Sequence, residues 1–169
     1  MKHTLLISLI FAAGLAGAAE TTVTLTGVHN CCKSCTNGIT KAATTVKDVT
    51  VTADGGTVKV TAKSKASAKK AVEAIMTAGY FGTSDAADEK SASSSAAKPA
   101  KKLTEATVSG AHLCCGKCVT AMTNAVKSVP GVTESNIVSK ASTFTVKGEF
   151  TESDLLAAMN KAGFTGEVK

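Results

Sequence analysis

The sequence predicts an α+β fold made of two βαββαβ units in tandem, joined by a flexible linker. Three observations lead to this prediction. A nine-residue motif occurs at residues 27–35 and again at 110–118. Each copy lies between a short alternating segment and an amphipathic helical pattern, and a stretch rich in Ala, Ser and Lys separates the two copies. With 169 residues, the chain has room for two small domains.

The N-terminal segment, residues 1–19, has the features of a secretory signal peptide. Lys2 gives a positive start, an apolar run follows from Leu5 to Phe11, and small residues end the segment at Ala18 and Ala19. An uncleaved anchor is the alternative, but a membrane span needs ~20 apolar residues, more than this segment offers. We therefore expect a periplasmic or secreted protein with no membrane span in the mature chain.

The first unit, residues 21–83, contains the patterns of six successive elements. Alternation predicts strands, apolar residues at i, i+3/i+4 and i+7 predict helices, and Asp54-Gly55-Gly56 predicts a hairpin turn. The expected elements are a strand at 22–26, a helix with Cys35, Ile39, Ala42, Ala43 and Val46 on its apolar face, strands at 49–52 and 57–62, a helix that begins at Ser67, and a short last strand.

The second unit, residues 104–169, repeats this order. Gly79 and Gly163 each fit the position just after a helix, and Asp154 fits a capping box begun by Thr151. The expected elements are a strand at 106–109, a helix with Val119, Met122, Ala125, Val126 and Val129 on its apolar face, strands at 132–138 and 143–147, a helix from Thr151, and a short last strand. The order βαββαβ is that of a ferredoxin-like domain.

Residues 84–103, between the units, are rich in Ala, Ser and Lys and contain one proline. They show no apolar periodicity, so they are predicted to be a disordered linker. Across the whole chain all 19 basic residues are lysines, and tryptophan is absent. A nucleic-acid-binding protein usually uses arginine to read bases and aromatic side chains to stack on them. We therefore expect no nucleic-acid partner.

Each motif has the spacing H-x-C-C-x-x-C, and together the two motifs contain every Cys and His that follows the signal peptide. Thiolates are favoured at a helix N-terminus, and sulfur ligands select Cu(I), Zn(II) and similar soft ions. Three sulfurs and one imidazole per copy could complete a four-ligand shell. The candidate metal ligands are Cys32, Cys35, Cys115 and Cys118, with Cys31, Cys114, His29 and His112 beside them.

Two other interpretations of the cysteines remain open. A C-x-x-C pair at a helix N-terminus also suits thiol–disulfide exchange, so a periplasmic thiol–disulfide oxidoreductase is the alternative function. Structural disulfides are common in exported proteins, but three thiols per copy cannot all pair within the copy. The histidines could be ligands or ordinary loop residues.

The βαββαβ order, with C-x-x-C between the first strand and the first helix and Gly-Tyr or Gly-Phe before the last strand, resembles the heavy-metal-associated domain family. That family includes copper chaperones, N-terminal modules of metal-pumping ATPases and a periplasmic mercury-binding protein. The resemblance implies a tandem pair of such domains, with soft-ion binding by the C-x-x-C pairs and Tyr80 and Phe164 near the site. The family motif G-M-x-C-x-x-C is altered here, because the Gly position holds His29 or His112 and a third Cys precedes the pair.

These features predict an exported protein, not an enzyme, that buffers, sequesters or transfers a soft metal ion through two Cys-rich sites. Cu(I) is the expected ion, and Zn(II), Hg(II) and Cd(II) are the alternatives. The two sites could act separately or hold one ion between them. A membrane metal transporter or another metal-binding domain is the expected protein partner.

Overall fold

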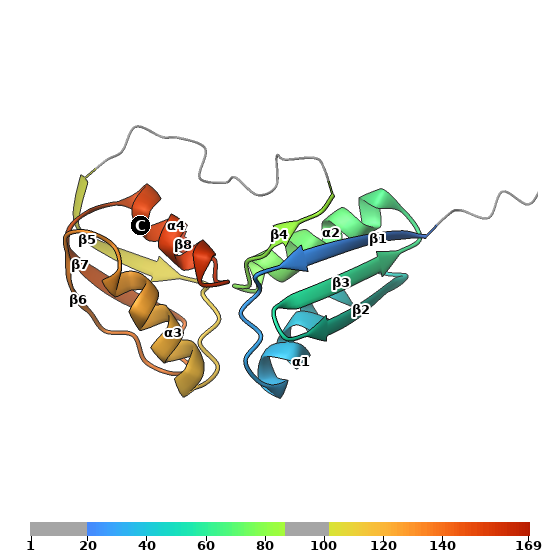
Figure 1. Ribbon diagram of the computed structural model, residues 1–169, viewed down its shortest axis with the longest axis horizontal. Helices are drawn as coiled ribbons and strands as arrows, with labels where there is room; N and C mark the ends of the chain where they lie inside the picture. The colour runs from blue at the N-terminus through green and yellow to red at the C-terminus, as the bar shows by residue number, and fades with distance from the viewer. Residues whose placement is uncertain (1–19, 87–101) are drawn as a thin grey trace, which may run out of the picture.

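The computed structural model describes residues 20–86 and 102–169. These residues form an α+β fold with two four-stranded antiparallel sheets and four helices (Figure 1). We call residues 20–86 the first half and residues 102–169 the second half. No helix within these two ranges is long and apolar enough to cross a membrane. The predicted signal peptide at 1–19 and most of the predicted linker at 84–103 lie outside the described residues.

The first half follows the predicted element order. Its sheet has the strand order β2-β3-β1-β4, so that β1 pairs with both β3 and the short β4. The two helices contact each other and lie on one face of the sheet. The elements are β1 (Thr21–Thr26), α1 (Lys33–Ala43), β2 (Val49–Asp54), β3 (Thr57–Ala62), α2 (Lys65–Thr77) and β4 (Thr83–Ser84).

The second half has the same topology, with the strand order β6-β7-β5-β8. The last strands of both halves are short, as expected, and each pairs with the first strand of its sheet. The elements are β5 (Lys102–Ser109), α3 (Gly116–Lys127), β6 (Val132–Ser135), β7 (Thr143–Thr151), α4 (Glu152–Lys161) and β8 (Glu167–Val168).

The cores confirm most of the apolar faces that periodicity predicts. In α1 the buried residues Cys35, Ile39 and Ala43 recur at every fourth position, which places them on one side of the helix. Met122 and Met159 are fully buried in the second half and act as core filler. The prediction for α3 omitted one residue: Cys118 is fully buried and begins the inner face, while the predicted Val119 is partly buried and packs against the core.

The start of α2 also differs from the prediction. Ser64 is the N-cap, and its side-chain oxygen accepts a hydrogen bond from the backbone N–H of Ser67 at 3.1 Å. Ser67 therefore lies inside the first turn, where its N–H needs the partner that Ser64 supplies. In α4 the predicted N-cap is confirmed, since Thr151 accepts a hydrogen bond from the N–H of Asp154.

Strand β6 is shorter than the predicted strand at 132–138. The Asn136 side chain accepts a hydrogen bond from the backbone N–H of Thr145 at 2.6 Å. The backbone N–H of Asn136 donates to the Thr145 carbonyl. This side-chain bond replaces the next ladder bond, so regular pairing ends at Ser135. Val138, which the prediction placed in the strand, is exposed.

The two halves meet at the loops that follow α2 and α4. An antiparallel bridge joins Tyr80 and Phe164, the N–H of Phe81 donates to the carbonyl of Gly163, and the N–H of Thr165 donates to the carbonyl of Gly79. These loops also contact the motifs across the interface: a Cβ on Gly79 would collide with the backbone of the second motif, and a Cβ on Gly163 would collide with that of the first. Glycine is therefore required at both positions for the halves to approach this closely.

Candidate metal centre

Both motifs lie at the junction between the first strand of a sheet and the helix that follows it. The second Cys of each motif is the helix N-cap: Cys32 caps α1 with φ −163° and ψ 167°, and Cys115 caps α3 with φ −154° and ψ 173°. Neither side chain accepts a capping hydrogen bond that would make it a structural cap. The last Cys of each motif, Cys35 or Cys118, lies in the first turn and is fully buried. Both sulfurs of each C-x-x-C pair are thus held at a helix N-terminus.

The loops that carry the two motifs face each other where the halves meet (Figure 1). Sulfur–sulfur distances show that the six cysteines converge there. All six lie within the described residues, and all are free thiols. Within each half, the Sγ of Cys35 or Cys118 contacts the sulfurs of the other two cysteines of its own motif at 3.5–3.8 Å. Across the interface, sulfur–sulfur distances of 3.5–3.8 Å join Cys31 to Cys115 and Cys118, Cys32 to Cys114, and Cys35 to Cys114 and Cys118. We call these six sulfurs the thiol cluster.

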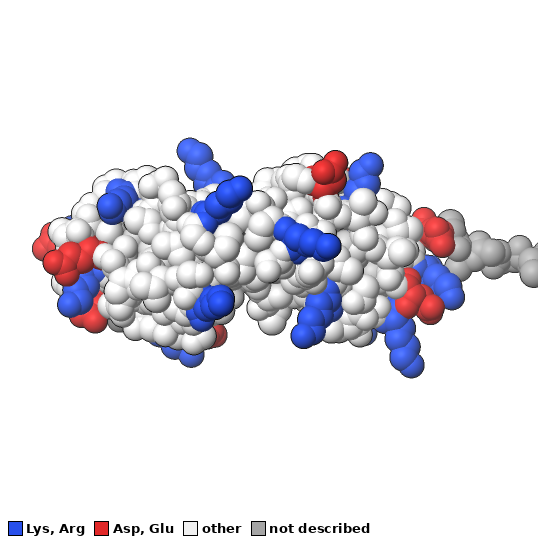
Figure 2. All heavy atoms as spheres, turned by 90° about the horizontal axis from the view of Figure 1, so that it is seen from below, with Lys and Arg blue, Asp and Glu red and all other residues white. Residues whose placement is uncertain are grey.

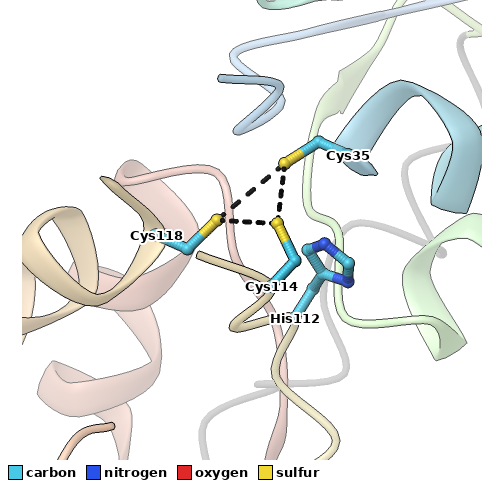
Figure 3. A group of neighbouring side chains, drawn as sticks. All are labelled: Cys35, His112, Cys114 and Cys118. Atoms are coloured by element: carbon cyan, nitrogen blue, oxygen red, sulfur yellow. Dashed lines mark hydrogen bonds between the residues drawn. The ribbon is translucent and has the colours of Figure 1, made fainter. Parts of the chain in front are cut away.

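The thiol cluster follows the sequence repeat. Each cross-interface pair has a counterpart in which the two motifs exchange roles, and the pair Cys35–Cys118 is its own counterpart. Figure 3 shows three of the sulfurs pointing toward one another: Cys35 from α1, Cys118 from α3, and Cys114 from the loop before α3. The cluster is therefore a nearly two-fold arrangement built from a single chain.

The thiols differ in their readiness to ionise. Backbone N–H groups at the start of α3, chiefly that of Cys118, lower the pKa of Cys115 to about 6, and the N–H of Cys35 likewise lowers the pKa of Cys32. Burial, together with hydrogen bonding to neighbouring thiols, raises the pKa of Cys31 and of Cys114. Since the thiolate is the ligating form, Cys32 and Cys115 are the thiols best prepared to bind an ion first.

The two histidines lie beside the thiol cluster, and each is covered by an aromatic ring from the opposite half. His29 stacks on Phe164 with ring centroids 4.3 Å apart, and Tyr80 lies 4.4 Å from His112. Burial lowers the pKa of both imidazoles, which favours the neutral form that can bind a metal. Each aromatic residue thus shields the histidine of the other half.

The two histidine environments differ at one atom. The Tyr80 hydroxyl forms a hydrogen bond of 2.8 Å with Nε2 of His112. Phe164, the matching residue of the second half, has no hydroxyl, and Nε2 of His29 is buried without a hydrogen-bond partner among the described residues. A hydrogen bond to one ring nitrogen commonly orients a histidine whose other nitrogen binds a metal. Tyr80 can serve His112 in this way.

The ligand atoms form four overlapping groups whose members all lie within 4.8 Å of one another. For a metal–sulfur bond of about 2.3 Å, neighbouring sulfurs are about 3.8 Å apart in a tetrahedral shell and about 4.0 Å apart in a trigonal one. The sulfur distances of the cluster, 3.5–3.8 Å, are close to these values. The groups are Cys35, His112, Cys114 and Cys118; His29, Cys31 and Cys118; Cys31, Cys32 and Cys35; and Cys32, Cys114 and Cys115.

The structure brings all eight predicted candidate ligands together, but not as two separate sets. Three of the four groups mix residues of both halves, so the motifs form one centre at the interface. The motif residues themselves could be found from their spacing in the sequence. The role of Gly79 and Gly163 as contact points could not, although the repeated Ala-Gly-aromatic sequence was a visible signal. Tyr80 and Phe164 lie beside the site, as the resemblance implied.

A centre of free thiols and neutral imidazoles between two α+β halves defines a candidate soft-metal-binding protein. Comparison of sequences supports this class: residues 107–165 match the heavy-metal-associated domain family. The match covers the second motif and indicates heavy-metal binding by this part of the chain. No curated protein sequence matches the chain.

The chain is also similar to two solved structures. One is the solution structure of the N-terminal soluble domains of Bacillus subtilis CopA, which is 17% identical, with 90% of this chain and 95% of that chain covered and a TM-score of 0.31. The other is a structure of the water-soluble region of the P-type ATPase CopA from the same organism, at 18% identity, 90% and 93% coverage and a TM-score of 0.31.

Proposed function

We propose that this protein is an exported, non-enzymatic binding protein for a soft metal ion, which buffers, sequesters or transfers that ion. The observation that supports the proposal is the convergence of six free thiols and two imidazoles at one interface. Thiolates and imidazoles are the ligands that soft metal ions prefer. Copper as Cu(I) is the expected ion, with Zn(II), Hg(II) or Cd(II) as alternatives.

The proposal includes the organisation of the chain. Residues 21–83 and 104–169 would be two heavy-metal-associated domains, and residues 84–103 would be a disordered linker between them. Export rests on the signal-peptide features of residues 1–19 and places the protein in the periplasm or outside the cell. The alternative to independent sites, an ion held between the two domains, is favoured by the cross-interface sulfur distances.

A membrane metal transporter or another metal-binding domain is the proposed exchange partner. On the face shown in Figure 2, acidic groups gather mostly toward the two ends of the molecule, whereas lysines also occupy its middle. A lysine-bearing surface favours approach by an acidic partner, because complementary charge accelerates encounter.

Titration of the reduced protein with Cu(I) and with Zn(II), each against a competing chelator, tests the proposal. We expect binding with a dissociation constant below the micromolar range. The matched control is the double variant Cys32→Ser plus Cys115→Ser, which removes the two thiols of lowered pKa and should weaken binding strongly. Failure of the unmodified protein to bind either ion, or undiminished binding by the double variant, would contradict the proposal.

The second candidate function is thiol–disulfide exchange in the periplasm. The pKa of Cys115, lowered to about 6, supports it, because such a thiol is largely thiolate at neutral pH. An insulin-reduction assay separates the two functions. Catalytic turnover with metal-free protein would favour the oxidoreductase, and its absence together with tight ion binding would favour the metal-binding protein.

A further inference from the structure

We propose that the thiol cluster binds several soft monovalent ions at once, joined by bridging thiolates, as one polynuclear centre. The inference rests on the proposed function and deepens it by stating how many ions the centre takes and how they are linked. Its starting point is the overlap of the four ligand groups, each of which contains at least three ligand atoms. Three ligands suffice for a trigonal site, so each group can hold an ion by itself.

The groups share their sulfurs in a way that requires bridging. Cys35 belongs both to the group with His112 and to the group with Cys31 and Cys32. Cys31, Cys32, Cys114 and Cys118 likewise each belong to two groups, and Cys115 belongs to one. If two overlapping groups are filled together, the sulfur that they share must bind both ions, because each Cys offers one ligand atom. A thiolate can do this, since its sulfur retains more than one lone pair.

The distances argue against two independent sites, one for each motif. The Sγ of Cys35 lies 3.5 Å from that of Cys114 in the other half, closer than the 3.7 Å that separates it from Cys32 in its own C-x-x-C pair. The Sγ of Cys118 lies 3.8 Å from Cys35 and 3.8 Å from Cys115. An ion placed on either C-x-x-C pair is therefore within reach of a sulfur from the opposite motif.

Charge permits more than one ion. Cys35 and Cys118 are fully buried, and a buried thiolate is costly unless a cation pairs with it. A monovalent ion that replaces one thiol proton leaves the net charge of the cluster unchanged. Several such ions can therefore enter without leaving an unpaired buried charge. Monovalent ions suit this centre because several of them fit the thiolate charge without exceeding it.

Two buried aromatic rings lie beside the histidines. Tyr80 lies against His112, and Phe164 lies against His29. His112 belongs to the group with Cys35, and His29 belongs to the group with Cys31. The two imidazoles can thus act as terminal ligands, while the bridging is left to sulfur.

The test uses the reduced protein saturated with Cu(I). Native mass spectrometry counts the bound ions, and X-ray absorption spectroscopy detects copper–copper scattering. We expect more than one ion per chain, up to the four that the ligand groups allow, with copper–copper scattering at short range. Saturation at one ion, or several ions without copper–copper scattering, would overturn the polynuclear centre and leave the proposed function intact. Absence of any binding would overturn both.

A pair of variants tests the bridging itself. Cys115→Ser removes a sulfur that belongs to one group, so the capacity should fall by no more than one ion. Cys31→Ser removes a sulfur shared by two groups of three ligands each, so the capacity should fall by two ions and the copper–copper scattering should weaken. Cys32→Ser, which also removes a sulfur shared by two three-ligand groups, serves the same purpose if Cys31→Ser unfolds the first half. Equal losses from shared and unshared positions would overturn the bridging.

Discussion

Replacing Gly163 with Ala should separate the two halves and divide the thiol cluster. Gly163 has φ +83°, and a Cβ there would collide with the backbone of His29 and Gly27. The left-handed conformation by itself costs a non-glycine residue about 1–2 kcal/mol. The collision also threatens the hydrogen bonds that the Gly163 carbonyl accepts from His29 and Phe81, each worth about 0.5–1.5 kcal/mol. We therefore expect contact between the halves to lose about 1–3 kcal/mol, or roughly 5- to 150-fold in population.

Gly110→Ala is the matched control for this variant. Gly110 has φ +78°, so alanine suffers the same backbone strain, but no heavy atom lies within 4 Å of its Cβ position. A difference between the two variants therefore reports the contact between the halves and not the strain.

Disulfide trapping measures the separation. The reduced monomer is oxidised with diamide at low concentration and digested with trypsin, and mass spectrometry identifies the joined peptides. The native protein and the Gly110→Ala variant should form disulfides between the motifs, such as Cys31–Cys115, whose sulfurs are 3.8 Å apart. The Gly163→Ala variant should form disulfides mainly within one motif. The reasoning is refuted if Gly163→Ala traps cross-motif disulfides as readily as Gly110→Ala does.

Three further predictions concern single side chains. Tyr80→Phe removes the hydrogen bond to His112 and should destabilise the metal-free protein by about 1–3 kcal/mol in urea unfolding. Phe164→Tyr offers Nε2 of His29 a partner and should stabilise the metal-free protein by about 1 kcal/mol. Effects of the same sign would contradict the assigned geometry. Because the pKa of Cys115 is lowered to about 6, its thiolate predominates above that pH. Its alkylation by iodoacetamide should therefore be fast at pH 7, and its rate should fall about tenfold for each pH unit below 6. A midpoint near the ordinary thiol pKa would show that the helix N–H groups do not act on Cys115. Thr151→Ala removes the N-cap of α4 and should cost about 1 kcal/mol in thermal or urea unfolding, and an unchanged stability would exclude the cap.

Local patterns were sufficient to predict the secondary structure and topology of each half. Apolar periodicity placed Cys35, Ile39 and Ala43 on the inner face of α1, and turn residues placed the hairpin between β2 and β3. The errors occurred where two local signals compete. Ser64 and Ser67 are both good capping residues, and only the extended backbone at Ser64 decides between them. On α3 the predicted residues Met122 and Val126 are buried, but the prediction left out Cys118, whose burial only the fold reveals.

The joining of the two motifs could not be predicted in the same way. It depends on the contact of Gly163 with the first motif and of Gly79 with the second, and these residues lie far apart in the sequence. Neither contact has a periodicity or a spacing that a single sequence reveals. The residue types at the centre were therefore predictable from spacing, whereas their union into one cluster emerges only from tertiary structure.

The difference between Tyr80 and Phe164 has a consequence for how such a centre can evolve. A dimer of two identical chains must place the same residue on both sides of its symmetry axis. Here both sides belong to one chain, so one side carries a hydroxyl and the other does not. A single chain that carries both motifs can therefore vary its two histidine environments independently and make them unequal, which no pair of identical subunits can do while keeping its symmetry.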